Sequence, residues 1–220
     1  MKRSEVNAIQ RYAKEFLAQH AWHLPPWAYW GPEDWKSRGS EIDEIKDCML
    51  GWDVTDFGSG DFSRRGLFLF TLRNGNLAGK SNKKYAEKIM IVQNDQETPM
   101  HFHRHKMEDI INRGGGELCI QLYASTKDEK LSNDPLTVSV DGISRTIKAG
   151  ETVRLKVGES ICLEPYMYHR FWAENGTTLV GEVSLVNDDT TDNRFFEEIG
   201  RFPAIEEDEE PLHLLVSDYS

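Results

Sequence analysis

The residues with the clearest chemical potential in this sequence are histidines that could bind a metal ion. His101, His103 and His105 alternate with other residues in the segment HFHRH. Because alternate residues of a β-strand point to the same face, at least two of these imidazoles would lie side by side. Glu108 follows them, and we expect the glycine run 114–116 to form a sharp hairpin.

A distant histidine completes a set of donors that suits a divalent metal ion. His169 stands in the segment EPYMYHRF. Together with His101, His103 and Glu108 it would supply three imidazoles and one carboxylate, which suit Mn, Fe, Ni, Co or Zn and leave positions for a substrate. An isolated H-x-H-x-H can also arise on an edge strand without any function. The carboxylate, the glycines and the second histidine segment together favour metal binding.

The composition restricts the class of protein. The 220 residues include 26 Lys and Arg and 37 Asp and Glu, so the formal net charge is −11. This balance disfavours nucleic acid as a main partner, because phosphate binding needs clustered positive charge. No apolar run approaches the roughly 18 to 20 residues that cross a bilayer, and MKRSEVNAIQ lacks the apolar stretch of a secretory signal. Three cysteines without a C-x-x-C pair argue against disulfides, so we expect a cytoplasmic protein without a membrane partner.

The pattern of apolar residues predicts a mainly β protein with helical ends. Val6, Ile9 and Ala13 recur at helical spacing after a candidate N-cap, Ser4. Short runs separated by turn signals predict eight strands, at 66–72, 88–93, 117–123, 136–140, 144–148, 152–157, 160–164 and 178–186. Strands at this density favour a closed barrel or a double-sheet jelly roll. The late segment RFFEEIGRF is compatible with a helix.

We expect one domain, residues 1–220. It would consist of a helical N-terminal extension over about 1–60, a barrel over about 66–186 and a C-terminal extension over 187–220. Short helices are expected at GPEDW and over 41–49, and the tryptophan-rich segment 22–35 is expected to pack onto the barrel. The acidic run 206–210 is expected to be a solvated face or a partner contact.

The candidate metal ligands resemble those of the cupin superfamily. The first cupin motif, H-x-H, four residues, glutamate, six residues, glycine, is matched by His101, His103, Glu108 and Gly115. The second motif is matched more loosely by Gly158, Pro165 and His169, because Met167 stands where glycine is usual and the histidine arrives one residue early.

Over nearly its whole length the chain is similar to a narrower family, the D-lyxose isomerases, which are cupin-type ketol-isomerases. The similarity is carried by MKRSEVNAIQ, HLPPWAYW, KIMIVQNDQETPMHFHRHKMEDIINRGGG and GEVSLVNDDTTDNRFFEEIGRFPAIEEDEEP. It implies a cupin-type jelly-roll barrel, a manganese cofactor, and the interconversion of D-lyxose and D-xylulose and of D-mannose and D-fructose. Exposed barrel faces lead us to expect a homodimer.

The chemistry implied by this resemblance needs a base and a cationic group. An aldose becomes a 2-ketose when a proton moves from C2 to C1, so a carboxylate must reach the C2 proton. Glu182 lies among apolar residues in LVGEVSLV, and Lys88 opens the strand that leads to His101. We expect Glu182 to act as the base and Lys88 as its electrophilic partner. A purely structural Lys88–Glu182 ion pair is the alternative.

The polar loop NDDTTDNRF supplies candidates for binding the sugar. Arg194 and Asp192, with Asp188 and Asp189 in the same loop, are expected to contact sugar hydroxyls. Arg194 could instead hold Glu182, or it could be a solvated loop charge.

Two other functions are compatible with the same residues. Three histidines and a glutamate also suit the iron of a cupin dioxygenase, and a cupin can bind a sugar without turning it over. Arginine and lysine do not cluster in the barrel segment as a phosphate site would require, which favours a free sugar over a sugar phosphate.

Overall fold

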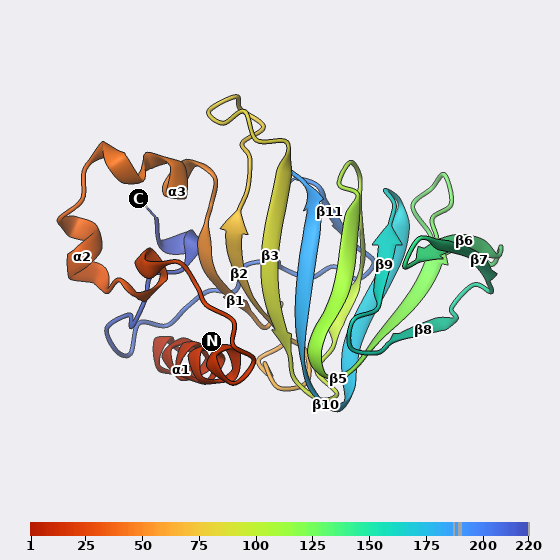
Figure 1. The fold of residues 1–220 in the computed structure, drawn as a ribbon, viewed down its shortest axis with the longest axis horizontal. Coiled ribbons are helices and arrows are strands. Elements are labelled where there is room, and N and C mark those ends of the chain that lie inside the picture. Colours follow the sequence, from red (N-terminus) through yellow and green to blue (C-terminus); the bar gives the residue numbers. More distant parts are fainter. Residues whose placement is uncertain (187, 189–190, 220) are drawn as a thin grey trace.

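The computed structural model describes residues 1–186, 188 and 191–219, and antiparallel β-strands are the main regular structure of this chain (Figure 1). The helices are α1 (Arg3–Gln19), η1 (Pro26–Tyr29), α2 (Pro32–Lys36), η2 (Ser40–Ile42), α3 (Asp43–Asp47) and η3 (Val216–Asp218). The strands are β1 (Gly51–Thr55), β2 (Leu67–Arg73), β3 (Tyr85–Val92), β4 (Thr98–His103), β5 (Glu108–Ala124), β6 (Leu136–Val140), β7 (Ile143–Ile147), β8 (Thr152–Leu155), β9 (Ser160–Leu163), β10 (Met167–Leu185) and β11 (Asn193–Phe195).

Two long strands, β5 and β10, organise the barrel. They pair with each other from Met167↔Ala124 to Ser184↔Glu108, and the register shifts near the middle of both strands. The late part of β10 pairs with β3 and the early part of β5 pairs with β9, which gives the strand order β1-β2-β3-β10-β5-β9-β6-β7. The early part of β10 pairs with β4, and the late part of β5 pairs with β8. The helices gather beside β1, and β6–β8 lie at the opposite end (Figure 1). The prediction of a mainly β, cupin-type jelly roll with N-terminal helices is confirmed.

The glycine run does not form the predicted hairpin. Residues 114–116 lie inside β5, at the bend where β5 and β10 pass from one sheet to the other. Gly115 has a φ of +90°, and a Cβ there would lie 2.1 Å from the carbonyl oxygen of Thr177. The two backbones approach so closely at this bend that only glycine fits.

Apolar side chains fill two layers. Between the sheets lie Leu118, Ile120, Leu122 and their neighbours. Outside them, the apolar face of α1 (Val6, Ala13) packs with the outer face of β2 and β3. The tryptophan-rich segment belongs to this outer layer, since the Trp27 ring lies 5.2 Å from that of Phe70. The helix begins at Arg3, so the prediction of Ser4 as N-cap is wrong. The Ser4 hydroxyl donates to Asp208 instead.

The strand predictions are mostly confirmed. Each of the eight predicted runs lies on a strand, although β5 and β10 extend well beyond their predicted bounds. The eight runs did not include β1, β4 or β11, although the alternating histidines already indicated a strand at the position of β4. The short helices expected at GPEDW and over 41–49 appear as α2 and as η2 with α3.

The C-terminal segment is not helical at RFFEEIGRF, contrary to the prediction. Its first residues belong to β11, and after Phe195 the chain forms no helix until η3. The pairing of β11 with β4 and a hydrogen bond of 2.9 Å from the Phe196 N–H to the Met100 carbonyl hold the start of this segment extended. The acidic run that follows makes long-range contacts of its own. Arg3 is buried and pairs with Glu207 at 2.6 Å and Asp218 at 2.9 Å, and Asp208 accepts the backbone N–H of Ser4. The acidic run therefore stabilises the positive N-terminal end of α1 instead of forming a wholly solvated face.

All three cysteines, Cys48, Cys119 and Cys162, are free thiols. Burial raises the pKa of both Cys119 and Cys162 to about 11, so these thiols stay protonated at neutral pH. A buried, protonated thiol packs as a small apolar side chain. None of the described helices has the length and apolar character needed to cross a membrane.

Candidate metal centre and active site

Three histidines meet inside the barrel, as the sequence predicts. His101 and His103 lie on the interior face of β4, and His169 on β10 is the direct register partner of His101. One ring nitrogen from each imidazole lies within 4.8 Å of the others, and all three side chains are buried. His105, which follows the end of β4, is exposed and lies outside this cluster.

Glu108 lies beside the histidines at the start of β5. Its Oε1 is 3.3 Å from Nε2 of His103 and 3.3 Å from Nε2 of His169. The carboxylate is buried, so its charge needs compensation. The spacing between His103 and Glu108 in the sequence allows the chain to turn once and bring both side chains to the same interior point.

The backbone orients two of the imidazoles. Nδ1 of His101 lies 2.7 Å from the carbonyl oxygen of Pro99, and Nδ1 of His169 lies 3.0 Å from that of Met167. If each Nδ1 carries the proton and donates it to the carbonyl, each Nε2 lone pair points into the cluster. Such outer hydrogen bonds are the usual way in which proteins fix a metal-binding histidine.

The charge states also fit a divalent ion. Burial lowers the pKa of His169 to about 4 and that of His101 well below its ordinary value, so both are neutral at neutral pH. Burial alone would raise the pKa of Glu108, but the Lys106 ammonium and the His103 imidazole outweigh it and lower that pKa well below normal. Neutral imidazoles and an ionised carboxylate are the forms that bind a metal.

The two predicted catalytic residues lie opposite each other on neighbouring strands. Glu182 of β10 pairs in register with Lys88 of β3, and Lys88 Nζ lies 3.4 Å from Glu182 Oε1. The Ser184 hydroxyl donates to the same oxygen at 3.0 Å. Burial alone would raise the pKa of Glu182, but Lys106 and Lys88 lower it below its ordinary value. Glu182 is therefore an ionised carboxylate that lines the cavity.

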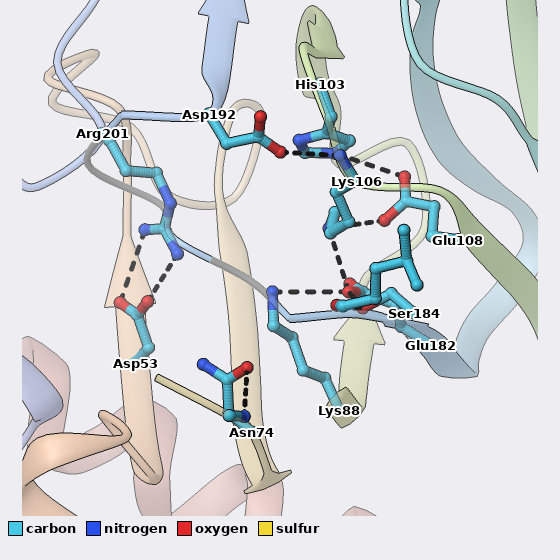
Figure 2. Close-up of polar contacts among 12 residues, drawn as sticks. Asp53, Asn74, Lys88, His103, Lys106, Glu108, Glu182, Ser184, Asp192 and Arg201 are labelled. Atoms are coloured by element: carbon cyan, nitrogen blue, oxygen red, sulfur yellow. Dashed lines mark hydrogen bonds and ion pairs between the residues drawn. The ribbon is translucent and has the colours of Figure 1, made fainter. Parts of the chain in front are cut away.

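Lys106, which the sequence did not indicate as a site residue, lies between the two carboxylates of this centre. Its Nζ lies 2.6 Å from Glu108 Oε2 and 2.9 Å from Glu182 Oε1, and the side chain is only 3% exposed (Figure 2). It thus bridges the metal cluster and the proposed base. Its signal in the sequence was its place between the histidines and Glu108, in the stretch HFHRHKME.

Asp192 is held close to this centre. Its two carboxylate oxygens accept the backbone N–H groups of His105, at 2.8 Å, and Lys106, at 3.0 Å. These bonds fix the turn between β4 and β5, from which Lys106 extends into the cavity. Asp192 therefore positions Lys106.

The structure does not bring Arg194 to the cavity. Asn193 and Phe195 of β11 line the cavity, whereas the Arg194 guanidinium pairs with Glu129 at 3.1 Å. The alternative in which Arg194 holds Glu182 is thus wrong. In the same loop, Asp188 accepts a hydrogen bond from Thr191, and Asp189 lies outside the described residues.

One cavity joins these groups. Its volume is about 40 Å³. Its apolar wall consists of Phe57, Leu67, Leu69, Met90, Ile110, Phe171 and Phe195. Besides the three histidines, its polar wall consists of Glu108, Glu182, Lys88, Lys106, Thr98, Asn193 and Arg201. A small polar molecule in this cavity would contact the histidine cluster, a carboxylate base and cationic groups at once.

Replacing Lys106 with methionine should destabilise the metal-free protein. The change keeps a similar volume but leaves Glu108 and Glu182 buried with one cation fewer. Breaking a buried ion pair typically costs about 3–5 kcal/mol, so we expect the free energy of unfolding to fall by that amount in urea titrations. Lys80→Met removes the exposed Lys80–Asp47 pair and should change that free energy by less than about 1 kcal/mol. Equal losses in the two variants would contradict a special role for Lys106.

Comparisons with known proteins point to one enzyme family. A family model described as D-lyxose isomerase matches residues 1–219. Two curated relatives are each called D-lyxose/D-mannose isomerase. The one from Serratia proteamaculans is 50% identical over 223 residues, covering 100% of this chain and 98% of the relative. The one from Escherichia coli O157:H7 is 48% identical with the same coverage.

Solved structures support the fold independently. The L-ribose isomerase of Cellulomonas parahominis with L-ribose has a TM-score of 0.62 and 17% identity, covering 94% of this chain and 98% of that chain. The L-ribose isomerase of Geodermatophilus obscurus has a TM-score of 0.62 and 16% identity, with the same coverage. At these identities the similarity is one of fold.

Proposed function

Because this chain belongs to the D-lyxose isomerase family, we propose that it interconverts D-lyxose and D-xylulose, and D-mannose and D-fructose, with a bound manganese ion. Its relatives establish the class of enzyme, a sugar isomerase, and their names supply the sugars. The observation that carries the proposal is the bridge made by Lys106. It joins a carboxylate of the histidine cluster to a second carboxylate, Glu182, in one cavity.

We propose that Glu182 moves the proton. It would take the proton from C2 of the open-chain aldose and return it to C1, while a hydroxyl proton passes from O2 to O1. A divalent ion held by His101, His103, Glu108 and His169 would polarise the carbonyl and the adjacent hydroxyl. Lys88 and Lys106, which both contact Glu182, would stabilise the negative charge of the enediolate and hold the hydroxyl proton in transit.

The cavity favours a neutral sugar. The structure brings three cationic groups to its wall, although the sequence showed no cluster of them. Each of them is paired with a carboxylate: Lys88 and Lys106 with Glu182, and Arg201 with Asp53. A phosphate would have to compete with these carboxylates for its cations, whereas hydroxyl groups can bind beside them.

The proposal is tested by incubating the manganese-loaded protein with a panel of aldopentoses and aldohexoses under anaerobic conditions. We expect D-xylulose from D-lyxose and D-fructose from D-mannose. Absence of both ketoses, with the metal confirmed by elemental analysis, would overturn it. Oxygen consumption with turnover would indicate a dioxygenase, and sugar binding without turnover would indicate a binding protein.

We also propose that the chain acts as one cytoplasmic domain that forms a homodimer. The outer face of β3 and β10 exposes Tyr85, Val183 and Leu185, beside Glu87, which pairs with Arg73. A face with apolar groups and both charges can pair with its own copy about a twofold axis. Light scattering should give twice the chain mass of 25.3 kDa, and a single-chain mass at micromolar concentration would contradict the dimer.

A further inference from the structure

We infer that Arg201, held by Asp53, binds the hydroxyl groups of the sugar at the end remote from its carbonyl. The inference rests on the proposed function, since it assigns a second binding position in the same cavity. It concerns residues that lie outside the predicted barrel: Asp53 comes from β1 and Arg201 from the C-terminal segment. Neither was a candidate from the sequence.

Arg201 is fixed at both of its ends. Its Nη2 lies 2.5 Å from Asp53 Oδ2, and its Nη1 lies 3.5 Å from Asp53 Oδ1. Its backbone carbonyl accepts a hydrogen bond of 2.7 Å from the Thr55 hydroxyl, two residues along β1. The Arg201 side chain is 9% exposed and the Asp53 side chain 5%. A group held in this way is preorganised, so a ligand does not have to order it on binding.

The guanidinium lies away from the proton-transfer groups. In Figure 2, Arg201 and Glu108 lie on opposite sides of the ammonium groups of Lys88 and Lys106. The region beside Glu108 and Glu182 must hold C1 and C2 of the sugar if these residues act as proposed. The remaining carbons of the chain then extend toward the opposite polar wall, where Arg201 lies.

Aromatic side chains connect the two polar ends. The ring of Phe195 lies 5.4 Å from that of His101 and 5.7 Å from that of Phe57, and both phenylalanines line the cavity with Arg201. Such rings suit the C–H face of a sugar carbon chain. The hydroxyl groups beyond this face need donors or acceptors of their own, and a guanidinium supplies donors in a planar fork.

A purely structural ion pair between β1 and the C-terminal segment is the competing explanation. The same segment already has a tether at the surface, where Arg65 pairs with Glu197 at 2.9 Å. Arg201 differs from Arg65 because it forms part of the cavity wall. A guanidinium can hold a carboxylate on one edge and meet a ligand with another, whereas a single ammonium is a poor substitute for both tasks.

The test compares Arg201→Lys with the wild type, using D-lyxose as the substrate. We expect KM to rise by about 10- to 100-fold and kcat to stay within about threefold of the wild-type value. The lost contact would bind the sugar, whereas the groups that transfer the proton would be unchanged. Calorimetric titration of D-lyxose into Arg201→Lys in a Glu182→Gln background should show the same loss of affinity without turnover. Bound manganese should be unchanged.

Controls separate the explanations. Arg65→Lys makes the same guanidinium-to-ammonium change in the other tether of the C-terminal segment, outside the cavity, and should leave KM unchanged. Asp53→Asn keeps Arg201 but removes the carboxylate that holds it, so KM for D-lyxose should rise as it does in Arg201→Lys. Unchanged KM in Arg201→Lys, or a fall in kcat alone, would overturn the inference while the wild type still converts D-lyxose. A wild type without ketose formation would instead overturn the proposed function.

Discussion

Glu182→Gln should lower kcat for D-lyxose by roughly 10²- to 10⁴-fold, the range typical for loss of a general base. Glutamine keeps the shape of the side chain and can still accept a hydrogen bond from Ser184 or Lys106, but it has no basic carboxylate. The C2 proton would then lose its proposed acceptor. Steady-state kinetics with ketose detection measures the effect.

Two further measurements distinguish a base from a structural ion pair. Bound manganese and the affinity for D-lyxose should both persist in Glu182→Gln, because none of the four candidate metal ligands is changed. Glu174→Gln is a matched control on the same strand. Glu174 pairs with Arg154 at 2.6 Å outside the cavity, so its loss should leave kcat unchanged. A Glu182→Gln variant with nearly normal kcat would assign the Lys88–Glu182 pair to structure alone.

The histidine cluster could be predicted because its signal is local. In a β-strand, the spacing of His101 and His103 already determines that both face one side, and Glu108 follows within one turn of the chain. Lys88 and Glu182 were also found, since charged residues stand out in strands that are otherwise apolar. The sequence did not give their register, but the structure pairs them directly across β3 and β10.

Lys106, Asp53 and Arg201 had no comparable signal. Lys106 lies in a turn, where neither helical nor strand periodicity indicates the direction of a side chain. Asp53 and Arg201 meet only because β1 joins the sheet beside β2 and the C-terminal segment returns to lie against β1. Contacts between residues so distant in the sequence depend on the whole fold, which a pattern of single residues does not encode.

The lengths of β5 and β10 were underestimated for a related reason. Each strand contains residues that normally end strands, the glycines at 114–116 in β5 and Asn175-Gly176 in β10. Taken singly, these residues predict turns. In the folded chain they face each other, and Asn175 and Gly176 have positive φ angles. Their conformational freedom bends both strands together without breaking the pairing, which creates the cavity between the two sheets.

Removing the metal should abolish turnover. In a variant that lacks one metal ligand, added manganese should not restore it. After treatment with a chelator, we expect ketose formation to fall to background and to return when manganese is added. His169→Gln should weaken manganese binding by more than the 10- to 100-fold that loss of an outer hydrogen-bond partner costs. Manganese at 100 times its Kd should stabilise the wild type by about 2.7 kcal/mol, which raises its Tm by roughly 5–10 °C. The His169→Gln variant should show little of this shift.

His105→Gln provides the matched control for that experiment. His105 belongs to the same alternating histidine segment, yet its side chain is exposed and lies outside the cluster of His101, His103 and His169. We expect His105→Gln to keep the wild-type thermal shift with manganese and the wild-type turnover. If both variants lost the shift, the histidine segment would act through the fold of its turn, and the assignment of the three histidines as metal ligands would be wrong. If His169→Gln kept the shift, the ion would have to bind elsewhere. The contrast between these two histidines therefore tests the cluster itself, independently of which sugar the enzyme converts.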